Sequence, residues 1–162
     1  MAASAFEKTI ELEGDSHDYL YWANLADSYR WLPGRKKDAS EAYIRAIQLM
    51  QNRLDKDPES SHLNSRLALF SAKNGDFESS QKALGVVLKN GNLSEIQFYR
   101  AAVTYEIMAN RAEAVSMLAR AIEAKYPLNE IKNDPELANL RQDPAYHRLL
   151  TNLNVQHKGQ DL

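Results

Sequence analysis

The sequence predicts an all-α protein built from helical hairpins that repeat along the chain. Apolar residues such as Leu84, Val87 and Leu88 recur at helical spacing, and no stretch alternates in the manner of a strand. Helix boundaries carry capping residues, prolines and an Asn-Gly pair in positions that favour starts and stops. A short pattern also recurs 34 residues apart, as from Leu67 to Ala101, which indicates a repeat architecture.

Composition excludes several functional classes. The chain has 162 residues, 20 basic and 22 acidic side chains, and no cysteine. A net charge of -2 gives no general attraction to polyanions, so nucleic acid is not an expected partner. Without cysteine there is neither a disulfide framework nor a thiolate zinc site. The longest charge-free apolar stretch, Ala83–Leu88, is far shorter than the ~20 residues of a membrane helix, so we expect no direct membrane insertion.

Three copies of the pattern mark the first helices of three hairpins. They read Trp22-x-x-Leu25-Ala26-x-x-Tyr29, Asn64-x-x-Leu67-Ala68-x-x-Ser71 and Phe98-x-x-Ala101-Ala102-x-x-Tyr105. Leu25 and Leu67 are 42 residues apart, which leaves eight extra residues to place. One falls in the Pro33-Gly34 turn, and seven, about two helical turns, extend the following helix through Leu54.

Capping chemistry places most of the remaining boundaries. Helices are expected to start at Asp57-Pro58, Asp134-Pro135 and Asp143-Pro144, and at capping boxes formed by Asn92 with Glu95 and by Asn110 with Glu113. Asn74-Gly75-Asp76 is typical of a helix stop followed at once by the next cap. Gly85 lies inside an expected helix, where glycine costs about 1 kcal/mol relative to alanine, so we expect close contact with a neighbouring helix there.

The recurring pattern resembles the tetratricopeptide repeat (TPR), a helix-turn-helix unit with a bulky residue, a large-small pair and an aromatic residue on its first helix. The match covers roughly residues 17–125. The resemblance implies an α-solenoid with a C-terminal helical cap. Its parts are the second helix of a truncated repeat (1–13), TPR repeats at 17–56, 59–90 and 93–125, a helical cap (126–152) and a loose polar tail (153–162).

The middle repeat departs from the family pattern. Asn64, Ser71 and Ser80 stand where two aromatic residues and a small apolar residue are usual, so we expect this repeat to be the least stable. The chain opens on a second-helix pattern, which we expect of a piece of a longer polypeptide. Its closing double Asp-Pro stretch is similar to the end of TPR segments in bacterial eukaryotic-like Ser/Thr protein kinases and related signalling proteins.

The resemblance also implies a concave groove lined by the first helices. The residues expected to bind a partner there are Asn24, Asp27, His62, Arg66, Leu69, Lys73, Ile96, Tyr99, Arg100 and Val103. Arg66 and Arg100 would act as forked donors to a carboxylate or acidic side chain of an extended peptide. The alternative is that both arginines are solvated or pair with nearby acids. The family's carboxylate clamp is disfavoured, because Ala23 and Asp27 occupy the places of its lysine and asparagine.

Two aromatic segments have both a functional and a structural interpretation. The turn Trp31–Lys37 joins an aromatic residue to three consecutive basic ones and could dock a partner; a stiff turn with a solvated basic edge is the commoner explanation. The run Tyr19–Trp22 could form an exposed contact patch, although tyrosine and tryptophan are largely buried on average.

These features predict a protein–protein interaction module within a larger bacterial signalling protein. The alternatives are self-association through the face of residues 1–12 that carries Phe6 and Ile10, and a stand-alone TPR chaperone of the secretion type. Catalysis is not expected, because His17, His62, His147 and His157 lie in separate segments outside any helical zinc motif. No cofactor or metal is predicted.

Overall fold

The structure, a computed structural model, describes residues 2–12 and 18–158, with the side chains of 3–11 and 18–151. All secondary structure in these ranges is helical, which confirms the all-α prediction. The elements are α1 (Ala2–Leu12), α2 (Tyr19–Arg30), α3 (Lys36–Leu54), α4 (Ser61–Lys73), α5 (Phe77–Lys89), α6 (Glu95–Ile107), α7 (Arg111–Glu123), α8 (Leu128–Asn133), the 3₁₀ turns η1 (Pro135–Leu137) and η2 (Leu140–Gln142), and α9 (Pro144–Lys158). The chain divides into two compact units, residues 1–91 and 92–162.

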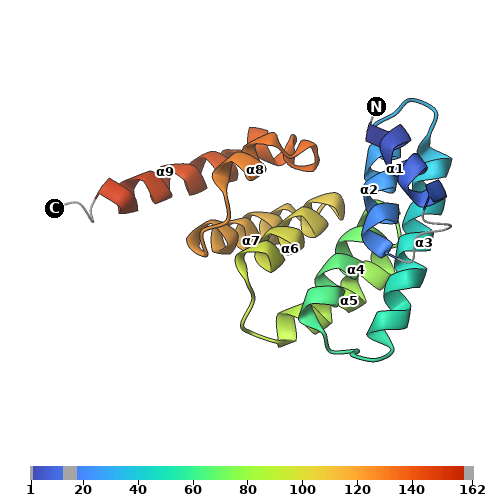
Figure 1. The fold of residues 1–162 in the computed structure, drawn as a ribbon. Coiled ribbons are helices and arrows are strands. Elements are labelled where there is room, and N and C mark those ends of the chain that lie inside the picture. The colour runs from blue at the N-terminus through green and yellow to red at the C-terminus, as the bar shows by residue number, and fades with distance from the viewer. Residues whose placement is uncertain (1, 13–17, 159–162) are drawn as a thin grey trace. The chain divides into compact units, whose positions relative to one another are not determined.

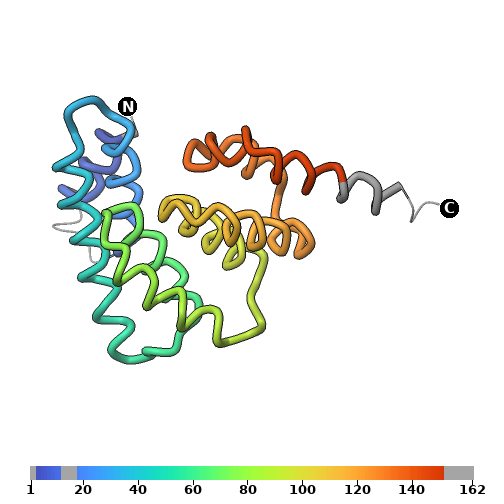
Figure 2. Tube along the Cα trace, turned by 180° about the vertical axis from the view of Figure 1, so that it is seen from behind, coloured from blue at the N-terminus to red at the C-terminus, as the bar shows by residue number. Residues whose placement is uncertain are grey.

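The first unit contains α1 and two helical hairpins. Helix α2 packs along α3 and α4 packs along α5, while α1 lies against α2 and α3 contacts α4 (Figure 1). Figure 2 shows the same pairs side by side from behind. Ala26 and Ala68, the small members of the repeated pattern, are fully buried within these hairpins. A small side chain at this position lets the backbones of paired helices approach each other.

The second unit is a third hairpin followed by an irregular helical segment. Helices α6 and α7 pair, η1 contacts α6, and α9 contacts both η2 and α7 (Figure 1). Ile131, Leu137 and Leu140 of this closing segment are fully buried. The segment predicted as a cap therefore contributes apolar side chains to the core of its unit.

Equivalent positions of the three sequence copies are buried in the same way. The small residues Ala26, Ala68 and Ala102 are 0% exposed, and the second-helix residues Ala46, Val87 and Ala121 are 0% exposed as well. The larger residues Tyr43, Leu84 and Leu118 are at most 2% exposed. The sequence period therefore corresponds to a recurring pattern of burial, hairpin by hairpin.

Local capping chemistry acts as expected at several helix starts. The Asp76, Asp134 and Asp143 carboxylates accept hydrogen bonds from the backbone N–H groups of Ser79 (3.0 Å), Glu136 (2.8 Å) and Ala145 (2.8 Å). Gly75 has a φ of +85°, the left-handed conformation in which glycine ends a helix without strain. Helix α3 ends at Leu54, so the predicted extension of this helix through Leu54 is confirmed.

Two predicted helix starts are wrong. Helix α6 has its capping box at Ser94 and Gln97, where the Ser94 N–H donates to Gln97 Oε1 at 2.9 Å, because the first turn begins two residues later than an Asn92 cap requires. Helix α4 begins at Ser61 rather than at Asp57-Pro58. The Asn64 amide donates to the carbonyl of Pro58 at 2.8 Å and so holds the intervening turn outside the helix.

Three further local predictions are corrected. Asn110 is the N-cap residue of α7, but its side chain makes no capping hydrogen bond, so the capping box predicted with Glu113 is not formed. A Cβ atom at Gly85 would meet no atom within 4 Å, so close helix contact does not explain this glycine. Helix α9 continues through Lys158, so the segment predicted as a loose tail is helical up to that residue.

Arg111 joins the closing segment to the third hairpin. Its Nε and Nη2 atoms donate to the two carboxylate oxygens of Glu106 at 2.7 and 2.6 Å, and the Glu106 side chain is 6% exposed. The Nη1 atom donates to Asp143 Oδ2 at 3.1 Å. The backbone N–H of Ala145 and, to a smaller extent, Arg111 lower the pKa of Asp143. The charged form of Asp143 therefore stabilises the folded second unit.

Replacing Ser71 with alanine should stabilise the middle hairpin. The Ser71 hydroxyl is buried and has no hydrogen-bond partner among the described residues, and an unsatisfied buried hydroxyl costs about 1 kcal/mol or more. We expect Ser71→Ala to raise the free energy of unfolding by about 1 kcal/mol. Urea unfolding followed by tryptophan fluorescence reports on this unit, since both tryptophans, Trp22 and Trp31, lie in it.

Ser80→Ala is the matched control, because the Ser80 hydroxyl donates to the Ala68 carbonyl at 2.8 Å and its loss should lower stability. A substantial loss of stability in Ser71→Ala would show that the Ser71 hydroxyl has a partner in solution.

The pKa of Asp143 predicts how the stability of the second unit depends on pH. Because the folded-state pKa is lowered, the contribution of Asp143 is present above the unfolded pKa of about 3.9 and is lost as pH falls through the folded value. We expect Asp143→Asn, which keeps the capping oxygen, to be less stable than wild type at pH 7. This difference should shrink as pH falls below the unfolded pKa and vanish below the folded one, in urea titrations followed by circular dichroism. A difference that persists at low pH would exclude the charge as its cause.

Candidate functional site

The residues predicted to bind a partner are distributed over both units. Six lie on α2 and α4 of the first unit, namely Asn24, Asp27, His62, Arg66, Leu69 and Lys73. Four lie on α6 of the second unit, namely Ile96, Tyr99, Arg100 and Val103. The surroundings of each set within its own unit show which of these side chains are already engaged.

Tyr99 of α6 contacts the closing segment, and Arg100 and Val103 are buried. The Tyr99 hydroxyl donates to the Asp134 carboxylate, and its ring stacks on Tyr126 with centroids 4.0 Å apart. Burial raises the pKa of Tyr99 well above its usual range, and the hydrogen bond to Asp134 adds to the effect. Arg100 and Val103 are 9% and 2% exposed, and Ile96 is half-buried. The pattern of α6 alone could not reveal Tyr99 as a contact for a segment some 30 residues further along the chain.

His62 lies in the first turn of α4, and Arg66 lies one turn further on. Arg66 is half-buried and His62 is exposed. The Arg66 Nε–H donates to His62 Nε2 at 3.3 Å, and its guanidinium carbon lies 5.9 Å from the centre of the Tyr19 ring. The guanidinium carbon of Arg53, from the end of α3, lies 4.7 Å from the centre of the same ring. The structure therefore brings Arg53 and Arg66 to the ring of Tyr19, with His62 hydrogen-bonded to Arg66.

Asp27 and Lys73 form an ion pair. Lys73 Nζ lies 2.6 Å from Asp27 Oδ1, and the lysine side chain is 10% exposed. The Tyr43 hydroxyl donates to the same Asp27 oxygen, so α2, α3 and α4 meet at one carboxylate. Asn24 is exposed, and Leu69 packs against the core of the unit. Asp27 and Lys73 were both predicted to line the groove. Because they form an ion pair, their charges partly neutralise each other.

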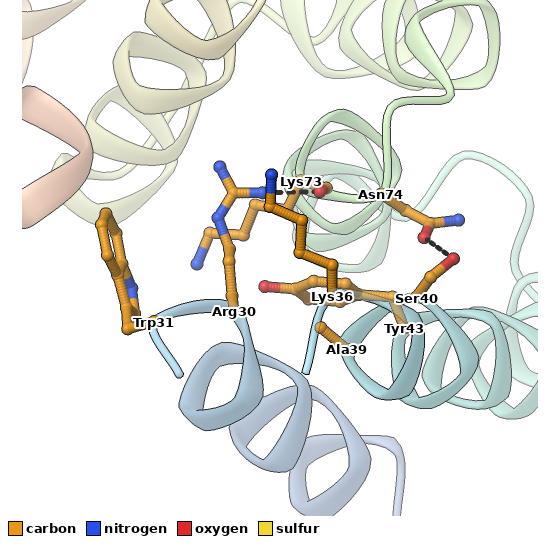
Figure 3. Close-up of a pocket in the computed structure, with 8 residues that line it drawn as sticks. All are labelled: Arg30, Trp31, Lys36, Ala39, Ser40, Tyr43, Lys73 and Asn74. Carbon is orange, nitrogen blue, oxygen red and sulfur yellow. Dashed lines mark hydrogen bonds between the residues drawn. The ribbon is translucent and has the colours of Figure 1, made fainter. Parts of the chain in front are cut away.

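A pocket of about 430 Å³ opens beside this ion pair (Figure 3). It lies where the ends of α2 and α4 meet the start of α3. Its lining residues are Arg30, Trp31, Lys36, Ala39, Ser40, Tyr43, Lys73 and Asn74. Lys73 belongs to the predicted groove. Trp31 and Lys36 belong to the turn Trp31–Lys37, which was considered as a separate docking segment.

The pocket is strongly cationic. Arg30, Lys36 and Lys73 line it, and no acidic side chain is among its lining residues. Figure 3 shows their nitrogen atoms gathered between the rings of Trp31 and Tyr43. Arg30 Nη1 donates to the Lys73 carbonyl at 2.6 Å, which holds the guanidinium at the pocket. With the adjacent Asp27 counted, the formal charge around the pocket is still positive, so the site suits an anionic group.

The walls of the pocket are both polar and apolar. The Ser40 hydroxyl donates to Asn74 Oδ1 at 2.7 Å across the ends of α3 and α4. The Trp31 side chain is 56% exposed, and the following Leu32 is 42% exposed. Large apolar side chains that remain in contact with water beside fixed charges are typical of interaction surfaces.

No protein-family model, curated protein or solved structure matches the chain. No helix in the described part of the chain is long and apolar enough to cross a membrane. The described residues also contain no cluster of histidine and acidic side chains able to hold a metal ion, and His17 lies outside them.

The segment predicted for self-association lies on the core of the first unit. Ile10 is 9% exposed and belongs to the same apolar cluster as Leu25 and Ala26. Phe6 packs partly buried against that cluster. These two side chains therefore stabilise α1 on its own unit.

Removing the Asp27 carboxylate should destabilise the first unit. Lys73 would keep a largely buried ammonium group without its partner, and Tyr43 would lose its acceptor. We expect Asp27→Ala to lower the free energy of unfolding by about 1–2 kcal/mol, near the low end for charged hydrogen bonds because 39% of the Asp27 side chain is exposed.

Urea unfolding followed by fluorescence checks this effect. Asn24→Ala, on the exposed face of the same helix, is the control and should be close to neutral. A double variant with Lys73→Met should lose less stability than the sum of the two single variants. Strict additivity would contradict the pairing.

Proposed function

We propose that the chain is a TPR-type protein–protein interaction module, an α-solenoid of helical hairpins with a C-terminal cap. The observation that carries the proposal is the recurrent burial in the three hairpins. Ala26, Ala68 and Ala102 occupy equivalent positions of the three sequence copies and are all 0% exposed. A repeat of one helical hairpin, stacked on its neighbours, is the architecture that such a period favours.

The proposed ligand is an extended peptide or a partner segment with acidic character. Support comes from the first unit, where α4 carries basic side chains along its length. His62 lies in its first turn, Arg66 lies one turn further on, and Lys73 ends the helix beside Arg30. Arginine binds carboxylates through paired donors, which favours a defined orientation of the bound group. The proposal requires no cofactor.

The proposed setting is a larger bacterial signalling protein, and this part rests on the TPR resemblance alone. In such a setting the module would bring the rest of the polypeptide to a partner. The binding surface, not a reaction, is then the property on which the protein's role depends.

Arg66 is the best residue with which to test this proposal. It is half-buried, and with the described residues it makes only a 3.3 Å hydrogen bond to His62 and a ring contact at 5.9 Å. Arg66→Glu should therefore leave the fold intact. Arg100 is 9% exposed, so its replacement would test folding as much as binding. We expect wild-type protein to select acidic peptides from a peptide array, and Arg66→Glu to lose at least about tenfold in affinity for them.

Lys89→Glu is the matched control, because it makes the same charge change at the exposed end of α5. Its affinity should stay close to that of wild type. An array in which acidic peptides are not enriched, or equal binding by wild type and Arg66→Glu, would contradict the proposed function.

A further inference from the structure

We infer that the pocket between Trp31, Lys36 and Lys73 binds the carboxylate of an acidic residue in a partner peptide, with a neighbouring apolar residue resting on Trp31. This inference rests on the proposed function, since it assigns one anchoring position to the peptide. It places that position at the junction of α2, α3 and α4 within the first unit.

Three consecutive basic residues stand at the start of α3, where positive charge is unfavourable. Arg35, Lys36 and Lys37 are consecutive at the positive end of the helix dipole, where cations are unfavourable and anions are stabilised. Arg35 pairs with Asp38, and Lys37 Nζ lies 3.6 Å from Glu41 Oε1. Lys36 makes no ion pair with a described residue, although it lines the pocket. A bound anion would therefore relieve an unfavourable feature of the helix.

Three cationic side chains line the same pocket. Lys36 shares the pocket with Arg30 and with Lys73, whose side chain is 10% exposed. Charges that are shielded from water act more strongly on a ligand than charges on an open surface. Asp27, 2.6 Å from Lys73, adds one negative charge at this end of the pocket. A singly charged carboxylate is repelled less by Asp27 than a doubly charged phosphate would be.

The apolar rim indicates a peptide rather than a small anion. Trp31 is 56% exposed and lines the pocket, and Leu32 beside it is 42% exposed (Figure 3). A free anion would leave both side chains in water, whereas a peptide could cover them with the residue next to its acidic side chain. Tryptophan is a common centre of such contacts, because its large rigid surface is buried at little entropic cost.

The experiment is a titration with a blocked peptide that carries two glutamates followed by leucine in a glycine–serine background. The indole of Trp31 should report binding by fluorescence, and Trp31→Phe should abolish the signal, while Trp22 remains as a background. Calorimetry then measures the same affinity without the reporter. A peptide with glutamine in place of glutamate, a phosphoserine peptide and inorganic phosphate are titrated in parallel.

Lys36→Glu and Lys37→Glu are the decisive pair of variants. Lys36→Glu should weaken binding at least about tenfold, whereas Lys37→Glu should change it by less than about twofold. Because an acidic residue suits the start of a helix, Lys36→Glu should keep or raise the thermal midpoint while it loses binding. A loss of affinity without a loss of stability separates a ligand-binding lysine from a structural one.

The other outcomes overturn the inference. If both variants lower the affinity equally, the peptide responds to the overall charge of the protein and not to the pocket. If Lys36→Glu leaves the affinity unchanged, the peptide binds elsewhere. Equal affinity for the glutamine peptide, or tighter binding of the phosphoserine peptide or inorganic phosphate, would overturn the assignment to a carboxylate. If Arg66→Glu abolishes binding to array peptides while Lys36→Glu does not, the proposed function stands and the pocket inference fails.

Discussion

The close approach of paired helices at small side chains is the constraint on which the hairpins depend. Ala26, Ala68 and Ala102 are each fully buried, and a larger residue at any of them would have to push two helices apart. Fully buried second-helix residues such as Ala46 and Val87 belong to the same packing. Once each hairpin is held in this way, the ends of its helices have fixed positions. The turns next to those ends, and the charged side chains beside the pocket, are then fixed as well.

The candidate site follows from that fixed arrangement. With α2, α3 and α4 held together, the carboxylate of Asp27 comes within reach of Tyr43 and Lys73, and it binds both. The cations that remain around the pocket, Arg30, Lys36 and Lys73, belong to three consecutive helices. Their mutual repulsion is tolerated because the packing of apolar and small residues, rather than ion pairing, determines where the helices lie.

Much of the fold could be predicted from local signals, and the failures share one cause. Asp134 and Asp143 cap the turns they precede, because a cap needs only a side chain and an N–H two or three residues away. Asp57 fails as a cap because Asn64, seven positions later, binds the turn instead. The candidate site could be predicted only in part. Lys73 was among the residues predicted to bind a partner, but its pairing with Asp27 and its place beside Lys36 in the pocket depend on three separate helices.

The amino-acid order alone determined the helical class, the recurrence of small residues such as Ala68, and the length of α3, because each depends on spacing along one helix or on contacts a few residues apart. Only the tertiary structure decided which side chains contact other parts of the chain and which line the pocket. Tyr99 binds the closing segment, and Lys36 joins a pocket with Arg30. The physical reason is that charge pairing and burial depend on distances through space, which the packing of separate helices sets and no pattern within one helix encodes.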